Sequence, residues 1–371
     1  MIRVGITGQT GFIGSHLFNF LKLKKDIELI RFDNIYFDDL FLLENFVKNC
    51  DVIIHLAAVN RHHDPNLIFE TNIELVKKLI NALENAKVKP KVLFSSSTQE
   101  ERDNPYGNSK RIGRELLQEW ALRNNSEFIA LIVPNVFGPF GKPFYNSVIS
   151  TFSYQLINNL EPKIEIDANL KLIYINDLVN IFYNLIVSDY KDFIYYVPHS
   201  KEIKVSDILK LINKFKDFYI NQNIIPYMSD SFERDLFNTF RSYIDIKNFY
   251  PVYLKINSDN RGYLVELIKE NSGGQIFYSV TKPKITRGNH FHLRKIERFC
   301  VINGKAEIKL RRVGTSEIIT FIVSGENPSI IDMPIWYTHN ITNIGNEELV
   351  TLFWSNEIFN PEDPDTYYEE V

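Results

Sequence analysis

The sequence is poor in cysteine and has no block of basic residues, and these two absences exclude several classes of protein. Its two cysteines, Cys50 and Cys300, lie far apart and outside any metal-type spacing, so neither a disulfide framework nor a cysteine zinc site is expected. Acidic residues outnumber basic ones and the formal charge is -4, which leaves no basic field for nucleic acid. We therefore expect no nucleic-acid partner.

Long apolar segments are also missing. No run approaches the roughly 20 apolar residues that a membrane helix needs. The opening residues MIRVGITGQT lack the apolar core and the cleavage site of a secretory signal. Together with the scarcity of cysteine, these features predict a cytoplasmic protein without membrane insertion.

The chain has 371 residues, which favours two domains, and its first half alternates short apolar runs with amphipathic stretches. Continuous apolar runs flanked by helices are typical of a parallel sheet covered on both faces. We therefore predict an α/β, Rossmann-type doubly wound domain. Its strands are expected over residues 2–7, 27–32, 51–58, 91–97 and 128–138, and its helices over residues 12–23, 40–48, 71–84 and 105–123.

The pattern changes near residue 250. Residues 200–250 indicate helices and loops, whereas short strands recur after them, as is typical of a sandwich or barrel. These strands are expected over residues 263–270, 274–282, 297–313, 316–325, 327–334 and 348–356. We place the boundary near 245 to 252 and predict domains over residues 1–248 and 249–371.

The stretch GITGQTGFIG supplies Gly8, Gly11 and Gly14 after a strand and at the start of a helix. Glycines permit the tight turn and the close backbone approach that let a pyrophosphate sit on a helix N-terminus. The pattern predicts a dinucleotide site, with Phe12 and Ile13 of the same turn as further cofactor contacts.

The choice of cofactor depends on ELIRFDN, at the end of the second strand. An acid there would bond the ribose 2′-hydroxyl of NAD, whereas an arginine would accept the additional phosphate of NADP. Arg31 precedes Asp33, so these residues alone leave the choice open.

A Tyr-x-x-x-Lys pair occurs three times, and one copy stands in a plausible site. NPYGNSK places Asn104 and Pro105 at a helix start, so that Tyr106 and Lys110 share one face. The preceding LFSSST ends a strand with hydroxyls at the carboxyl edge of the sheet, where ligands bind in such folds. The other pairs, interpreted as surface or strand residues, are Tyr243/Lys247 and Tyr278/Lys282.

These residue types suit reduction of a ketone. A tyrosine hydroxyl has an unperturbed pKa of about 10, and a neighbouring ammonium is expected to lower that pKa toward neutrality. The phenol could then pass a proton to a carbonyl oxygen whose carbon receives hydride. A serine hydroxyl would hold that oxygen in place.

Residues 1 to about 240 resemble the extended short-chain dehydrogenases/reductases, in the branch that modifies sugar nucleotides. The resemblance implies that Tyr106 is the catalytic acid and that Lys110 tunes its pKa and binds ribose. It also implies that Ser97 orients the substrate carbonyl, with Ser96 and Thr98 as possible substitutes.

Two further segments carry this resemblance. HLAA, at residues 55–58, matches the family's loop along the cofactor, and PNVFGP, at residues 134–139, matches the segment that flanks nicotinamide and substrate. The resemblance therefore implies cofactor contacts by Leu56, Ala57 and Pro134, and a substrate contact by Asn135.

The segment RGNHFHLRKIERF gathers two histidines and a glutamate. On a strand, His290 and His292 project from the same face, and a turn can return Glu297 toward them. His339 is expected on a later strand. Three nitrogens and one oxygen suit zinc or another divalent metal.

Residues 252 to 371 resemble the two-part signature of the cupin barrel, which implies an all-β jelly-roll domain around that metal. Lys284 and Trp336 stand where the signature has glycine, and we expect them to affect loop shape more than ligand identity. DNRGYLVELI and TRGNHFH also resemble the sugar-nucleotide 3,5-epimerases, whose barrel abstracts a proton beside a ketone.

The combination of the two domains, with QEERDNPYGNSK and the terminal NPEDPDTYYEEV, resembles the bifunctional capsular polysaccharide enzymes of the CapF type, which act in UDP-N-acetyl-L-fucosamine synthesis. The resemblance implies C-3 epimerisation of a UDP-2-acetamido-2,6-dideoxy-4-ketohexose by the cupin domain. It further implies reduction of the C-4 ketone with NADPH to the 6-deoxy-L-talose derivative, in a homodimer that holds zinc.

Two other interpretations are open. One is a monofunctional NAD(P)-dependent sugar-nucleotide 4-ketoreductase whose cupin domain only binds ligand or shapes a dimer. The other is a regulator that senses NADPH without catalysis. The presence of Ser97, Tyr106 and Lys110 argues against the regulator, because a sensor needs the glycines but not the proton donor.

Overall fold

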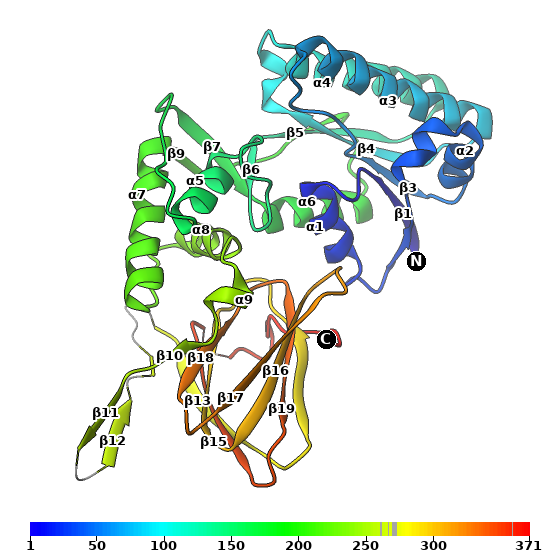
Figure 1. Ribbon diagram of the computed structural model, residues 1–371. Coiled ribbons are helices and arrows are strands. Elements are labelled where there is room, and N and C mark those ends of the chain that lie inside the picture. Colours follow the sequence, from blue (N-terminus) through cyan, green and yellow to red (C-terminus); the bar gives the residue numbers. More distant parts are fainter. Residues whose placement is uncertain (260–261, 266, 269–272, 358) are drawn as a thin grey trace. The chain divides into compact units, whose positions relative to one another are not determined.

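The computed structural model describes residues 1–259, 262–265, 267–268, 273–357 and 359–371, in two compact units (Figure 1). The first unit comprises Met1–Thr151 and Ile166–Val205, and the second comprises Phe152–Glu165 and Ser206–Val371. The helical residues 206–249 thus pack within the second compact unit. The division into functional domains at 248/249 stays a prediction.

A six-stranded parallel sheet forms the centre of the first unit, in the order β2-β1-β3-β4-β5-β8. Its strands come from the predicted apolar runs, with one further strand at the edge, and the doubly wound α/β prediction is confirmed. The strands are β1 (Ile2–Thr7), β2 (Ile27–Ile30), β3 (Val52–His55), β4 (Lys91–Ser97), β5 (Phe128–Val133) and β8 (Ile194–Tyr196).

Helices cover both faces of this sheet. On one face α2 (Leu40–Lys48), α3 (Pro65–Ala86) and α4 (Pro105–Asn124) pack side by side, and on the other α1 (Phe12–Leu21) packs on α6 (Ile175–Val187) (Figure 1). α3 begins before the predicted residue 71, because the Asp64 side chain accepts a hydrogen bond from Asn66 N and Pro65 occupies the first turn. Among the described residues, no helix is both long and apolar enough to span a membrane.

The strand order of the sheet reverses between β1 and β3. The chain runs outward from β1 to β2 and then returns to the other side of β1, so the carboxyl ends of β1 and β3 lie together. Such a switch point is where open α/β sheets bind ligands. The smaller elements of the first unit are η1 (Asn34–Asp38), η2 (Thr98–Glu101) and a sheet of β6 (Asn135–Phe137), β7 (Asn169–Tyr174) and β9 (Lys201–Lys204).

Two five-stranded antiparallel sheets form the barrel of the second unit, and the predicted all-β carboxyl-terminal fold is confirmed. Their inner faces share an apolar core that includes Phe299, Ile308, Leu310, Ile341 and Phe353. One sheet comprises β10 (Val252–Tyr253), β18 (Ser329–Met333), β15 (Glu297–Asn303), β20 (Leu349–Ser355) and β13 (Gln275–Thr281). The other comprises β17 (Ile318–Ser324), β16 (Lys305–Arg312), β19 (Tyr337–Asn343), β14 (Thr286–Phe291) and β21 (Tyr367–Tyr368).

A separate hairpin of β11 (Ile256–Asp259) and β12 (Gly262–Val265) precedes β13. The predicted strand over residues 263–270 coincides with β12 as far as residue 265, and residues 266, 269 and 270 lie outside the described part of the chain. The helices before the barrel are α5 (Val148–Ile157), α7 (Val205–Phe215), the π-helical segment η3 (Lys216–Asn221), α8 (Ser231–Arg241) and α9 (Ile246–Phe249).

A buried polar cluster ties these helices to the barrel. The Arg298 guanidinium forms two bonds, of 2.7 and 3.0 Å, with the Asp332 carboxylate, and both side chains are almost fully buried. The Tyr219 hydroxyl bonds to the same carboxylate and lies 2.6 Å from the Tyr250 hydroxyl.

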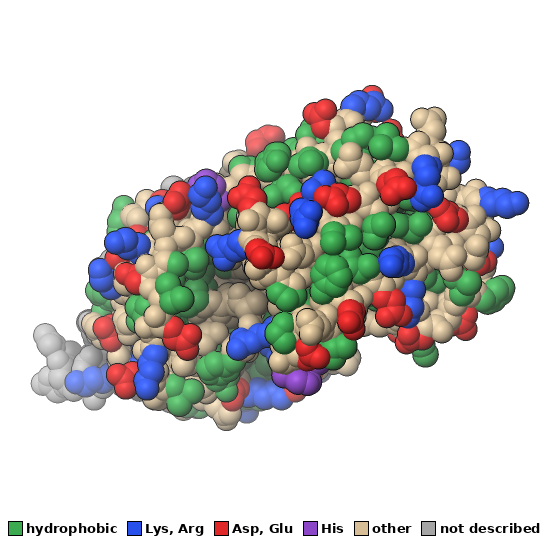
Figure 2. All heavy atoms as spheres, turned by 90° about the horizontal axis from the view of Figure 1, so that it is seen from above, with side chains coloured by type: hydrophobic (Ala, Val, Ile, Leu, Met, Phe, Trp, Pro, Cys, Tyr) green, Lys and Arg blue, Asp and Glu red, His purple; other side chains and the backbone are tan. Residues whose placement is uncertain are grey.

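At the surface drawn in Figure 2, basic and acidic side chains are interspersed, as the near balance of charged residues predicts.

Candidate functional site

A cavity of about 570 Å³ lies at the switch point of the parallel sheet. Gly8 and Gly11 line it from the turn between β1 and α1, and Leu56 and Ala57 line it after β3. Gly8 has a φ of +73°, and a Cβ there would lie 2.8 Å from Ala57 N. The backbone thus approaches as closely as the glycine pattern predicts.

The amino terminus of α1 faces this turn. Gly11 caps the helix without a side-chain hydrogen bond, so the first backbone N–H groups are available to an anion. A Cβ on Gly14 would lie 2.2 Å from Gly8 O, which keeps the helix tight against the turn. Phe12 and Ile13 occupy the first helical turn between these glycines.

The opposite wall of the cavity contains a lysine that sequence reasoning missed. Lys78 of α3 lines the cavity, and its ammonium lies 3.0 Å from the Glu74 carboxylate and 3.6 Å from Asp38. Arg31 is exposed and does not line this cavity, and the Asp33 carboxylate caps η1 by accepting from Ile35 N. The sequence did not indicate this position for Lys78, because a lysine on an amphipathic helix is usually solvated.

The predicted proton-transfer residues lie at the end of β4 and in the helix that follows it. Ser97 is the last residue of β4, and Tyr106 and Lys110 lie in the first turns of α4. The Asn104 side chain caps α4 by accepting from the backbone N–H of the third helical residue, at 2.8 Å. Lys110 Nζ donates to Ser95 O at 2.8 Å and lies 5.7 Å from the centre of the Tyr106 ring.

Burial sets the ionisation of both groups. It raises the pKa of Tyr106 to about 12, with a smaller contribution from Tyr145, so the expectation that this pKa is lowered toward neutrality is wrong. Burial also lowers the pKa of Lys110 to about 8, against an opposing effect of Glu100. The phenol therefore stays protonated at neutral pH, as a proton donor must.

The three candidate hydroxyls before α4 differ in their surroundings. Ser96 Oγ bonds to the Glu100 carboxylate, which also pairs with Arg114 at 2.9 Å. Thr98 is exposed at the start of η2. Ser97 Oγ accepts a hydrogen bond from Gln99 N at 3.1 Å, which leaves its own hydrogen to donate to a carbonyl oxygen. This geometry favours Ser97.

Asn72 of α3 is a second residue that sequence reasoning missed. Its amide donates to Val59 O and to Ser109 Oγ, each at 2.9 Å, and Ser109 Oγ donates to Tyr106 O at 2.7 Å. The buried amide thus links the loop after β3 to the turn that carries the tyrosine. A single asparagine in an amphipathic helix gives no sequence signal for this role.

The predicted substrate-side residues follow β5. Pro134 is buried between β5 and β6, and Asn135, the first residue of β6, is exposed. The Asn135 amide donates to Lys171 O at 3.2 Å. Both residues therefore lie after the carboxyl end of a central strand.

In the second unit, the structure brings His290, His292, Glu297 and His339 together, with one potential ligand atom of each within 4.8 Å of the others. His290 on β14 pairs with His339 on β19 across the sheet, next to a β-bulge. Glu297 begins β15, and His292 lies just beyond the end of β14. The predicted convergence of the four side chains is confirmed.

His292 and His339 are the two most buried histidines of this cluster, and each is oriented so that its Nε2 atom could bind an ion. His292 Nδ1 donates to Asp365 O, and His339 Nδ1 lies 3.2 Å from Tyr337 O. Their Nε2 atoms are buried, have no hydrogen-bond partner among the described residues and lie 3.1 and 3.5 Å from Glu297 Oε2. Backbone carbonyls at Nδ1 are the usual way to orient a metal-binding imidazole, so these residues fit a divalent cation.

The electrostatics of the cluster also suit a cation. Burial, with His339 and His292 nearby, lowers the pKa of His290 to about 3, so this imidazole is neutral at pH 7. Burial alone would raise the pKa of Glu297, but the pairing with His292 and His339 holds it well below its usual value. The site thus offers an ionised carboxylate beside imidazole nitrogens.

Lys284 and Trp336, which stand where the cupin signature has glycine, both adopt the left-handed backbone conformation. Their φ angles are 63° and 61°, in a region that glycine enters without steric cost. Trp336 N donates to His292 O at 2.9 Å, and its ring stacks on Phe291. These contacts offset part of the cost of the conformation.

Two family descriptions match the chain. Residues 4–193 match the NAD dependent epimerase/dehydratase family, and residues 257–367 match the polysaccharide biosynthesis C-terminal domain. The first match covers the parallel sheet except its edge strand β8 and the first residues of β1, together with the residues that line the cavity. The second covers the residues of the His/Glu cluster.

The chain is similar over its full length to two characterised proteins. It is 32% identical over 370 residues to UDP-2-acetamido-2,6-beta-L-arabino-hexul-4-ose reductase of Pseudomonas aeruginosa, covering 99% of this chain and 98% of that protein. The crystal structure of capsular polysaccharide assembling protein CapF from Staphylococcus aureus is 35% identical, with a TM-score of 0.63 and full coverage of both chains. The likeness to CapF-type enzymes is confirmed.

A more distant structure shares part of the fold. The structure of RMD from Pseudomonas aeruginosa complexed with NADPH is 20% identical, with a TM-score of 0.52, and covers 58% of this chain and 82% of that chain.

Proposed function

Because the chain belongs to the NAD dependent epimerase/dehydratase family, we propose that it is a bifunctional sugar-nucleotide enzyme. Its barrel would epimerise C-3 of a UDP-2-acetamido-2,6-dideoxy-4-ketohexose. Its first unit would then reduce the C-4 ketone with NADPH to UDP-2-acetamido-2,6-dideoxy-L-talose. Two sites in one chain support this proposal: the glycine-lined cavity of the first unit and the His/Glu cluster of the second. The same chain matches a UDP-hexulose reductase over nearly its full length.

In the reduction, NADPH bound in the cavity would supply hydride to C-4. The Tyr106 phenol, which burial keeps protonated, donates its proton to the C-4 oxygen. Ser97 orients that oxygen, and Lys110 binds the ribose and can return a proton to the tyrosine, because its own pKa is about 8. Asn72 holds the turn that positions the phenol.

NADPH rather than NADH is the proposed reductant. Two cations are candidates to meet a 2′-phosphate: Lys78, which lines the cavity, and Arg31, which is exposed just after β2. Replacement of either by alanine should weaken NADPH binding more than NADH binding, measured by titration of the cofactor into the purified protein. An equal loss for both cofactors in Arg31→Ala would place Arg31 outside the phosphate pocket.

In the epimerisation, one zinc ion would be held by His290, His292, Glu297 and His339. It would supply a Lewis acid that stabilises the negative charge on the C-4 oxygen while C-3 loses its proton and regains one on the opposite face. A closed set of four protein ligands is typical of a structural site, and it favours the alternative in which the barrel only binds ligand. Catalysis therefore requires the substrate to take a fifth position or to displace a ligand.

The proposed assembly is a homodimer. β13 is an edge strand of its sheet, and its exposed apolar side chains include Ile276, Phe277, Tyr278 and Val280. An exposed apolar edge is a template for pairing with another chain, and a second copy of the barrel would cover it.

Two variants test the assignment of one activity to each unit. Tyr106→Phe should reduce the rate of NADPH oxidation by about 10²- to 10⁴-fold and leave exchange of the C-3 hydrogen intact. His290→Ala combined with His292→Ala should abolish metal binding and C-3 exchange.

Tyr243→Phe, in another Tyr-x-x-x-Lys pair, is the matched control and should retain both activities. Unchanged NADPH oxidation in Tyr106→Phe would contradict the reductase assignment. A wild-type rate of C-3 exchange in the metal-free double variant would show that the metal has a structural role and no catalytic one.

A further inference from the structure

The residues between two of the proposed metal ligands form a bend outside regular secondary structure. Leu293–Ile296 connect His292, just past β14, to Glu297 at the start of β15. His292 Nε2 lies 3.1 Å from Glu297 Oε2. Both side chains can bind one ion only while this connection keeps its shape, so whatever fixes the bend also fixes the site.

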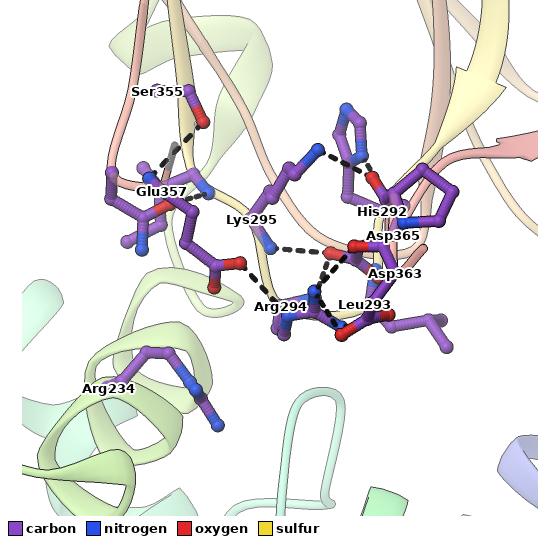
Figure 3. Close-up of polar contacts among 12 residues, drawn as sticks. Arg234, His292, Leu293, Arg294, Lys295, Ser355, Glu357, Asp363 and Asp365 are labelled. Carbon is purple, nitrogen blue, oxygen red and sulfur yellow. Dashed lines mark hydrogen bonds and ion pairs between the residues drawn. The ribbon is translucent and has the colours of Figure 1, made fainter. Parts of the chain in front are cut away.

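Asp365, near the carboxyl terminus, makes the contacts that fix the bend (Figure 3). Its Oδ1 accepts from Leu293 N at 3.0 Å, and its Oδ2 accepts from Arg294 N at 2.9 Å and from Lys295 N at 2.8 Å. Asp365 is 1% exposed. A buried carboxylate that accepts three successive backbone N–H groups is a strong, charge-assisted contact.

The same residue also orients a ligand directly. Asp365 O accepts a hydrogen bond from His292 Nδ1, which places the proton on Nδ1 and leaves the lone pair on Nε2. Asp365 has a φ of 41°, in the left-handed region that aspartate and asparagine tolerate better than most residues. One residue thus holds both the ligand and the bend that follows it.

The tail that carries Asp365 is attached at other points of the site. Within β21, Tyr368 pairs with His290 of β14. Thr338, which precedes the ligand His339, donates to Glu369 O through its hydroxyl. The tail therefore reaches the strands or the loop of all three histidines.

We propose that Asp365 is a positioning residue of the metal centre and that residues 365–369 form a clasp that holds the ligand loop in its metal-binding shape. The inference rests on the proposed metal site and adds to it a partner that lies 73 residues beyond His292 in the chain. It also gives a role to the terminal NPEDPDTYYEEV segment, which supplies neither a ligand nor a cofactor contact.

The test is zinc affinity, without substrate, of Asp365→Asn in the full chain. Asparagine keeps the volume and tolerates the left-handed backbone, but it replaces one acceptor oxygen by an N–H₂ group that faces backbone N–H donors. Loss of such an outer partner typically weakens metal binding by about 10- to 100-fold. Competition with a chromogenic chelator measures the zinc dissociation constant, and the absorption spectrum of bound Co²⁺ reports the ligand geometry.

Asp363→Asn is the matched control on the same tail. The Asp363 carboxylate is exposed and pairs with the Arg294 side chain at 2.8 Å, so its loss should leave zinc affinity within about twofold of wild type. Thermal unfolding of the metal-free proteins identifies a purely structural role, which would lower stability without changing the zinc dissociation constant of the folded chain.

The outcomes are distinguishable. Zinc binding that is at least tenfold weaker in Asp365→Asn than in Asp363→Asn, with an altered Co²⁺ spectrum, supports the clasp. Wild-type zinc affinity in folded Asp365→Asn overturns it while leaving the metal site intact. A wild-type protein that binds no zinc refutes the metal site itself and the clasp with it.

Discussion

Replacing Lys110 by methionine should stabilise the cofactor-free first unit at pH 7. The lysine is buried, and burial lowers its pKa from 10.5 to about 8, because the interior solvates an ammonium poorly. Between these values the unfolded chain binds more protons than the folded chain, so wild-type stability rises with pH across this window. At about 1.4 kcal/mol per pH unit, the charged ammonium costs about 3 kcal/mol at pH 7.

Methionine removes that cost together with the hydrogen bond from Nζ to Ser95 O, which is worth about 1 kcal/mol. The variant should therefore be about 2 kcal/mol more stable than wild type at pH 7, an advantage that falls to near zero by pH 10. Urea unfolding followed by circular dichroism measures both differences. Lys77→Met, at an exposed lysine of α3, is the control. If the difference in free energy of unfolding between Lys110→Met and wild type is independent of pH, the conclusion that burial lowers the pKa of Lys110 is refuted.

Two further predictions concern close packing and buried charge. Gly14→Ala places a Cβ 2.2 Å from Gly8 O and should lower kcat/KM for NADPH by on the order of 10²-fold, whereas Gly113→Ala, whose Cβ meets side chains at 3.2 Å, should change it little. Arg298→Met leaves the Asp332 carboxylate buried without its pair and should destabilise the second unit by about 3–5 kcal/mol. The double change with Asp332→Leu should recover most of this loss in urea unfolding, and failure to recover would show that the pair is not the source of the effect.

Local patterns were sufficient to predict most of the fold. Continuous apolar runs predicted the central strands of the parallel sheet, because strands buried on both faces need apolar residues at every position. The glycines after β1 were recognised because few other residues permit a close backbone approach. His290 and His292 were recognised because few other residue types can supply the nitrogen ligands of a cation site. These signals lie within short stretches of sequence, so they can be recognised without knowledge of the tertiary structure.

Features that depend on distant contacts were not predicted. Lys78 reaches the cavity wall, and Asn72 reaches the loop after β3, because α3 packs beside the switch point. The same residues on a surface helix would be solvated. The pKa of Tyr106 is raised by burial, which sequence spacing does not reveal. Asp365 stands in an acidic tail that is typical of solvent-exposed sequence, and its burial depends on the pairing of β21 with β14.

The most direct test of the account is solvent exchange at C-3 in the absence of NADPH. Wild-type protein incubated in deuterium oxide with the UDP-2-acetamido-2,6-dideoxy-4-ketohexose should introduce deuterium at C-3, detected by nuclear magnetic resonance. Tyr106→Phe should do the same, because its proton donor serves the other unit. If the C-3 hydrogen is retained while the same preparation oxidises NADPH with this substrate, the chain is a reductase with a non-catalytic barrel and the bifunctional account is contradicted.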